Sequence, residues 1–212
     1  MGAIIFYLCI ILLFAAFVGY KSLAQLKIWT DVARQLDLEI EHRWTLLSMK
    51  LDGTFQQRET KVWQRSSQGQ GRYKRHHTMI RVALHGELWR EIDLQSLDCP
   101  DAYDSGDLSK SYVGPDVSDL AGRYKIASDS IDGTLEALNN PEALDILSRL
   151  DSAYHHFSIG DGYLTVDSLN TLNNSVWFVE WIRDIHDDAE ELEHSVAKKT
   201  TLEPTHQWSP TD

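Results

Sequence analysis

Two pairs of adjacent histidines, His76-His77 and His155-His156, have side chains that can bind a metal ion. Neutral imidazole is a common ligand of zinc and other transition metals. Adjacent residues of a strand point to opposite faces, so each pair can offer at most one ligand to a given site. Because no HExxH or CxxC arrangement accompanies them, we expect ordinary strand histidines. The ligands of an alternative metal site would be His77 and His155.

Four aspartates occupy every third position of an acidic segment: Asp98, Asp101, Asp104 and Asp107. Hard cations such as calcium favour clustered carboxylates. The ligand spacing of an EF-hand is absent from this segment and from residues 129–133. We therefore expect no calcium site here, and the candidate ligands of an alternative one are Asp101 and Asp104.

Other chemistry has few candidates. His186 and His194 can share a helix face with Glu190, but acidic residues surround both, which favours a solvated surface that includes Asp188 and Glu191. No serine lies in a Gly-x-Ser-x-Gly elbow, and no glycine-rich phosphate loop is present. Cys99 precedes a proline in acidic surroundings that disfavour a thiolate. We predict a protein that is not an enzyme and has no cofactor, the alternative being a site assembled only by the fold.

Charge is unevenly distributed along the chain. The net charge is −12, with 13 Lys or Arg and 7 Asp or Glu in residues 1–90, and 7 and 25 in residues 91–212. The first part therefore carries +6 and the second −18. A partner of the second part would meet a strongly acidic surface.

The basic segment between residues 58 and 90 also contains Trp63 and Tyr73, residue types that bind nucleic acid. The acidic remainder would repel a polyanion, so we expect no nucleic-acid partner. We hypothesise contact with the anionic cytoplasmic leaflet, where each cation contributes about 1 kcal/mol. The alternative is that these cations only solvate the outer face of a sheet. The predicted membrane-surface residues are Lys21, Lys27, Arg58, Lys61, Arg65, Arg72, Lys74 and Arg75.

The residues from Gly2 to Tyr20 include no charged side chain. As a helix, this stretch of 19 residues is about 28 Å long, close to the roughly 30 Å of a bilayer core. We predict that residues 1–21 form the transmembrane helix of a single-pass membrane protein. The alternative is a signal peptide that is cleaved after Ala24.

Lysine and arginine next to a membrane helix tend to stay on the cytoplasmic side. None precedes the apolar stretch, whereas Lys21, Lys27 and Arg34 follow it. Cys99 is the one cysteine beyond the stretch, so no internal disulfide can form there, as a reducing compartment allows. The predicted orientation therefore places the soluble part in the cytoplasm.

The predicted soluble part is one domain over residues 22–194, followed by a polar, disordered tail over 195–212. An amphipathic helix at 23–36 joins it to the anchor. Alternating residues predict strands at 47–51, around 62, at 80–84 and at 92–94, which form an antiparallel meander. Its turns are expected at Asp52-Gly53 and at 68–71, and Ile131-Asp-Gly-Thr134 is a further expected turn.

After an expected loop at 98–120, a strand is predicted around Tyr124 and Ile126. Asn140-Pro141 supplies an N-cap and first-turn proline for a helix up to about residue 150. Asp161-Gly162 predicts a hairpin turn, and the last helix covers 174–193, capped by Asn174 or Ser175. Strands followed by helices indicate an α+β fold built on an antiparallel sheet.

The order of these elements resembles a loosely defined group of uncharacterised bacterial proteins with a single membrane anchor and an α+β domain. The matching residues are Trp29 to Leu36, Leu51 to Gly53, Asn140 to Glu142, and Asp161 to Gly162. The resemblance implies the anchor and the fold, and it implies no activity.

The absence of catalytic motifs and the separation of charge lead to a functional hypothesis. We predict a non-enzymatic accessory or scaffold subunit that is tethered to the lipid bilayer and contacts other protein subunits. The alternative is a membrane-anchored sensor that binds a small ligand or a metal ion through the histidine pairs and the aspartate segment.

Overall fold

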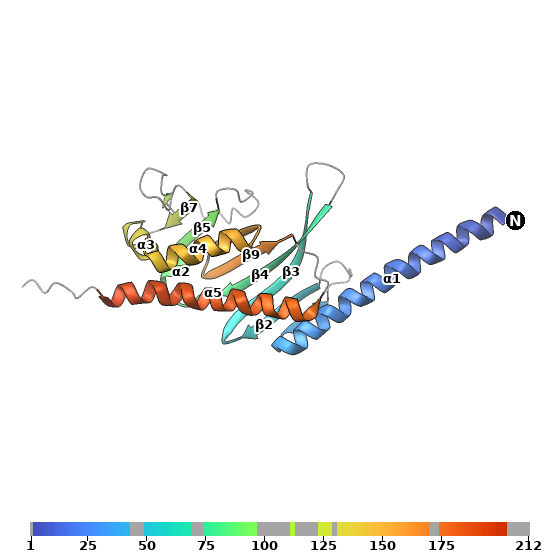
Figure 1. The fold of residues 1–212 in the computed structure, drawn as a ribbon, viewed down its shortest axis with the longest axis horizontal. Coiled ribbons are helices and arrows are strands. Elements are labelled where there is room, and N and C mark those ends of the chain that lie inside the picture. The colour runs from blue at the N-terminus through green and yellow to red at the C-terminus, as the bar shows by residue number, and fades with distance from the viewer. Residues whose placement is uncertain are drawn as a thin grey trace, which may run out of the picture. The chain divides into compact units, whose positions relative to one another are not determined.

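The computed structural model describes residues 2–42, 49–68, 74–96, 111–112, 123–128, 131–169 and 174–202. Within them the chain has the predicted α+β fold, with an apolar N-terminal helix and antiparallel strands (Figure 1). The chain divides into two compact units where one domain was predicted. Unit 1 comprises Met1–Ile80 and Leu169–Arg183, and unit 2 comprises Arg81–Ser168 and Asp184–Asp212.

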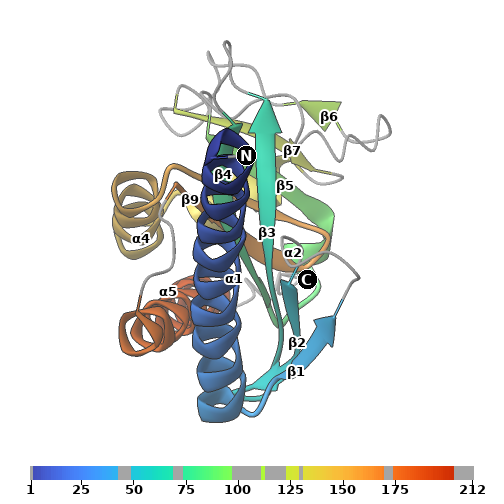
Figure 2. The ribbon, with the colours of Figure 1, turned by 90° about the vertical axis from the view of Figure 1, so that its right-hand side faces the viewer.

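The first helix, α1, runs without interruption over Gly2–Leu36, so the predicted anchor and the predicted joining helix are one element (Figure 2). At about 1.5 Å per residue its 35 residues are about 52 Å long. It ends where Asp37 adopts a positive φ of 53° and the Leu38 N–H donates to the Ala33 carbonyl at 2.9 Å. This is the hydrogen bond that closes a helix in a Schellman motif.

Unit 1 is built on four strands in the order β1 (Glu39–His42), β2 (Met49–Phe55), β3 (Arg58–Gln68) and β4 (Lys74–Ala83). β4 continues into unit 2 from Arg81. Leu51 of β2 lies opposite Val62 of β3, and both are fully buried. Since alternate residues of a strand share a face, the sheet has one buried face and one partly exposed face.

The turn between β2 and β3 is not at Asp52-Gly53, as predicted, but at Gln56-Gln57, whose φ angles are 48° and 65°. Asp52 and Gly53 lie inside β2 and pair with β3. A Cβ on Gly53 would lie 3.0 Å from Leu38 Cδ2, so the glycine makes room for Leu38 rather than for a turn. Two left-handed residues give a hairpin that follows the twist of its strands.

Unit 2 contains the strands β9 (Tyr163–Ser168), β8 (His156–Gly160), β5 (Ile92–Ser96), β7 (Tyr124–Ser128) and β6 (Ser111–Tyr112), in that order. The predicted meander is wrong at its fourth strand, because β5 pairs with β7 and β8. The short helix α2 (Leu88–Glu91) separates β5 from the end of β4 and takes the chain out of the meander.

The predicted β8–β9 hairpin is confirmed, with φ angles of 54° at Asp161 and 79° at Gly162. Its turn is also tied to the chain before β5. The Leu84 N–H donates to the Gly162 carbonyl at 2.7 Å, and the Gly162 N–H donates to the Trp89 carbonyl at 2.9 Å. Both polar groups of one glycine therefore hold the hairpin in place.

Three further helices are α3 (Ile131–Leu138), α4 (Pro141–Ala153) and α5 (Ser175–Leu202). The predicted cap of α4 is confirmed, because Asn140 Oδ1 accepts a 2.8 Å hydrogen bond from the Ala143 N–H. The predicted turn at 131–134 is wrong, since these residues open α3. Thr134 is buried there, with its hydroxyl 2.7 Å from that of Ser128.

The last helix begins as predicted, since Asn174 Oδ1 accepts a 2.8 Å hydrogen bond from the Val176 N–H. It continues to Leu202, through the first part of the segment predicted as a disordered tail. Ser195 and Val196 are buried, so the packed face of the helix extends past the predicted end. Residues 203–212 and most of the predicted loop at 98–120 lie outside the described residues.

Candidate functional site

The N-terminal part of α1 is covered with exposed apolar side chains. From Phe6 to Leu23 their exposed fractions range from 46% to 73%. Within the described residues α1 is the one helix long and apolar enough to cross a membrane. The exposed side chains are Phe6, Tyr7, Ile10, Ile11, Leu12, Leu13, Phe14, Phe17, Val18, Tyr20 and Leu23.

The C-terminal part of α1 belongs to the core of unit 1. Trp29 is 1% exposed and meets Phe178 of α5 edge to face, with ring centroids 5.6 Å apart. Val32 and Leu36, on the same face of the helix, are also buried. One helix therefore passes from an exposed apolar surface into a packed core with no intervening loop.

Two cations predicted for the membrane surface lie where the exposed apolar stretch ends. Lys21 and Lys27 are exposed, and Lys21 Nζ lies 5.1 Å from the centroid of the Phe17 ring. Arg34 follows, 3.7 Å from Asp31. The orientation of the helix in a membrane stays a prediction.

The predicted basic surface on β3 is compensated by acids. Lys61 is paired with Glu59 of the same strand. On the neighbouring strand Lys50 Nζ lies 2.7 Å from Asp52 and 3.0 Å from Glu41, and hydrogen bonds first to Asp52 and then to Glu41 raise its pKa. The described outer face of β1–β3 is thus mixed in charge, which favours the alternative that its cations solvate a sheet.

The remaining predicted membrane-surface residues have different outcomes. Arg58 is only 7% exposed, so the prediction of a surface contact is wrong for this side chain, which alternation along β3 turns inward. Arg65 is exposed. Arg72 lies outside the described residues, as do the side chains of Lys74 and Arg75.

The candidate metal ligands are not brought together among the described residues, which contain no group of three or more His, Cys, Asp or Glu side chains able to hold a metal ion. His77 is buried in unit 1. His155 belongs to unit 2 and is exposed, with its ring 4.0 Å from that of His156. Asp101 and Asp104 lie outside the described residues.

The predicted solvated face of α5 is wrong at two positions. His186 is 1% exposed and Asp188 is 9% exposed. His194 is exposed, and its Nδ1 lies 2.9 Å from the Glu190 carbonyl oxygen. A helix that packs along one side buries every third or fourth residue. A charged residue at such a position can be buried when a partner of opposite charge lies within reach.

For Asp188 the partner is Arg149 of α4, which sequence reasoning missed. Its Nε and Nη2 atoms donate to Asp188 Oδ1 at 2.9 and 2.6 Å, and Nη2 also donates to Glu191 Oε2 at 2.5 Å. Arg149 is the one cation between Lys125 and Arg183 in an acidic part of the sequence. A single cation among many carboxylates was the signal in the sequence that could have indicated an ion pair of Arg149.

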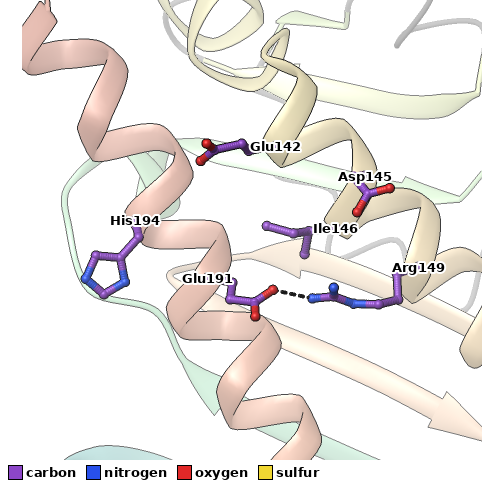
Figure 3. Close-up of a pocket in the computed structure, with 6 residues that line it drawn as sticks. All are labelled: Glu142, Asp145, Ile146, Arg149, Glu191 and His194. Carbon is purple, nitrogen blue, oxygen red and sulfur yellow. Dashed lines mark hydrogen bonds and ion pairs between the residues drawn. The ribbon is translucent and has the colours of Figure 1, made fainter.

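The Arg149 cluster lies in an open groove of about 290 Å³ between α4 and α5 (Figure 3). Glu142 and Asp145 line the groove from α4, and Glu191 and His194 line it from α5. The groove has the residues to attract cations, and its one cation is already paired. It contains no Ser or Cys nucleophile.

Burial and pairing act in opposite directions on Asp188. Its pKa is raised above the ordinary value, because burial outweighs the lowering by Arg149. The pKa of Arg149 is raised, first by its hydrogen bond to Glu191. The cluster therefore serves to hold α4 against α5 while compensating a buried carboxylate.

Comparisons with known proteins give little. The sequence matches no protein-family model, and no curated protein is significantly similar to it. The crystal structure of the mycobacterial trehalose monomycolate transport factor A, TtfA, is similar over 83% of this chain and 94% of that one, at 11% identity and a TM-score of 0.46. A likeness of this degree does not indicate a shared function.

Proposed function

We propose that the protein is a single-pass, membrane-tethered and non-enzymatic accessory subunit, in which α1 both spans the bilayer and holds unit 1 at a defined height above it. The observation that carries this proposal is the continuity of α1. Its exposed apolar part runs directly into the buried Trp29, Val32 and Leu36. A flexible tether would only keep a domain near the membrane, whereas an unbroken helix also orients it.

Energetics support the span. Eleven large apolar side chains are exposed on α1, and no apolar partner covers them among the described residues. Exposing such a surface to water costs about 25 cal/mol for each Å². Each leucine, isoleucine or phenylalanine contributes about 0.3–0.6 kcal/mol to insertion at the centre of a membrane helix.

Extraction of membranes at alkaline pH tests the anchor. Placing two arginines at the centre, Leu12→Arg with Leu13→Arg, costs about 6–8 kcal/mol of insertion and should release the protein into the soluble fraction. The matched control, Ser22→Arg with Leu23→Arg, adds the same charges at the end of the stretch and should stay in the pellet. Equal extraction of both variants would refute the anchor. A mature protein that begins at Gln25 would also refute it, because the apolar stretch would then have been cleaved off as a signal peptide.

The two native cysteines test the orientation. We infer a cytoplasmic soluble part, because Lys21, Lys27 and Arg34 all follow the apolar stretch. In a Cys9→Ser variant, a membrane-impermeant maleimide should modify Cys99 only after the cells are lysed. Modification in intact cells would show the opposite orientation.

The accessory role rests on charge. Residues 91–212 carry −18, and three of the six residues that line the described groove between α4 and α5 are acids. A basic surface on a protein partner complements it. Native electrophoresis of gently solubilised membranes should show the chain in a species larger than its own 24.3 kDa plus detergent. Migration of the chain alone, after crosslinking in intact membranes, would contradict an accessory role.

A further inference from the structure

Unit 1 has a second exposed apolar surface besides α1. Val176 and Trp177, neighbours in the first turn of α5, are 57% and 44% exposed, and Leu169, which precedes the helix in the sequence, is 41% exposed. We call these three residues the α5 entry patch. Within the described residues they are the exposed large apolar side chains that lie outside α1.

The α5 entry patch is held rigidly. The Trp177 ring stacks on that of Trp181 at 5.9 Å, with 19° between the planes. Phe178, the next residue, is fully buried against Trp181 and against Trp29 of α1. The patch is therefore fixed relative to α1 by a continuous set of aromatic contacts, and Figures 1 and 2 both show the first turns of α5 beside α1.

The position of Trp29 along α1 places the patch near the membrane surface. Leu23, the last large exposed apolar side chain of α1, precedes Trp29 by six residues, or about 9 Å of helix. The headgroup layer on each side of a bilayer core is about 5–7 Å thick. The first turn of α5, in contact with Trp29, thus lies within a side-chain length of that layer.

The chemistry of the patch fits the boundary between headgroups and acyl chains. Tryptophan is enriched at this boundary, where an amphipathic ring suits a partly wet environment. The exposed face of α5 becomes charged immediately after the patch, with Glu180, Arg183 and Asp184. Apolar groups limited to the first turn suit a helix whose end touches the membrane, rather than a helix that lies flat in it.

We propose that the α5 entry patch docks on the lipid headgroup–acyl boundary of the membrane that α1 spans, as a second contact that sets the tilt of unit 1. This inference rests on the proposed function, because it needs α1 to be inserted. Because Phe178 contacts Trp29, which lies only about 9 Å of helix beyond the exposed apolar surface of α1, lipid is favoured as the occupant over a soluble partner or a second copy of the chain.

Fluorescence quenching by spin-labelled lipid tests the contact on the full-length chain in phosphatidylcholine vesicles. One cysteine is labelled with bimane in each variant, after the other cysteines are replaced by serine: native Cys9 for the span, Val176→Cys for the patch, and Thr54→Cys as an exposed control on β2. The quenchers are two phosphatidylcholines, one carrying a doxyl group near the headgroup for the patch and one carrying it near the middle of the acyl chains for Cys9.

The outcomes separate the two proposals. Quenching at Val176→Cys that approaches that of Cys9, and exceeds that of Thr54→Cys several-fold, supports the contact. Quenching at Cys9 but not at Val176→Cys supports the span and overturns the docking of the patch on lipid. The same result is expected if a protein, and not lipid, covers the patch. Cys9 that is no better quenched than Thr54→Cys refutes the span and the inference together.

Discussion

Replacing Arg149 by methionine should destabilise unit 2 in a way that depends on pH. The substitution keeps an apolar stem but leaves Asp188 buried without its cation. Loss of one partner costs about 3–5 kcal/mol for a fully buried pair and about 0–1 kcal/mol for an exposed pair. The side chain of Arg149 is 45% exposed and that of Asp188 is 13% exposed, so we expect a loss of about 2 kcal/mol near neutral pH.

The sign of the pH dependence follows from Asp188. Burial already raises its pKa in the intact protein, and removing Arg149 takes away the main group that lowers it. A raised carboxyl pKa favours the folded state at low pH, where the acid is neutral in both states, and this advantage disappears as pH rises through the folded pKa. The deficit of the variant should therefore be smaller at about pH 4, close to the ordinary aspartate pKa of 3.8, than at about pH 7.

Urea unfolding of the full-length chain in non-ionic detergent, followed by circular dichroism, measures this deficit at both pH values. Glu191→Gln is the matched control, because Glu191 is 58% exposed and its loss should cost only about 0.5 kcal/mol. Adding Asp188→Asn to Arg149→Met should remove the pH dependence. A deficit of equal size at both pH values would show that Arg149 acts by packing rather than by compensating Asp188.

Three further substitutions test local structure by the same unfolding measurement. Asn140→Ala removes the cap of α4 and should cost about 1 kcal/mol, whereas Asn140→Ser should cost much less. Changing Gln56-Gln57 to Asn-Gly should stabilise the β2–β3 hairpin by about 1 kcal/mol, because both positions are left-handed; no gain would contradict the turn. Gly162→Ala should cost about 1–2 kcal/mol, from its φ of 79° and a Cβ 3.2 Å from Arg90 Cγ, while Gly19→Ala, with nothing within 4 Å, should not destabilise the fold.

Local signals in the sequence predicted those elements whose cause is local. Asn140-Pro141 and Asp161-Gly162 specify a helix start and a hairpin turn through their own backbone preferences, and both predictions are confirmed. Asp52-Gly53 carries the same dipeptide as the hairpin but lies inside β2, because Leu38 packs over the glycine. The same dipeptide thus has two outcomes that only tertiary contacts distinguish.

Pairings between distant segments could not be predicted in this way. β5 looked like the next strand of a meander, yet its partners β7 and β8 come much later in the chain. Asp188 looked like one more acid on a solvated helix, and its burial depends on Arg149 of another helix. Periodicity shows which face of an element is apolar, but not which charged residue on its edge will find a counterion.

Because α1 is unbroken from Gly2 to Leu36, a tilt of its membrane part is transmitted to unit 1. A helix that is longer or shorter than the local hydrocarbon thickness adapts by tilting, at a small cost for each Å of mismatch. With a flexible joint, such tilting would stop at the membrane surface. Here any change of tilt turns Trp29 and the sheet packed around it by the same angle, so an inserted α1 would convert bilayer thickness into the direction in which unit 1 faces.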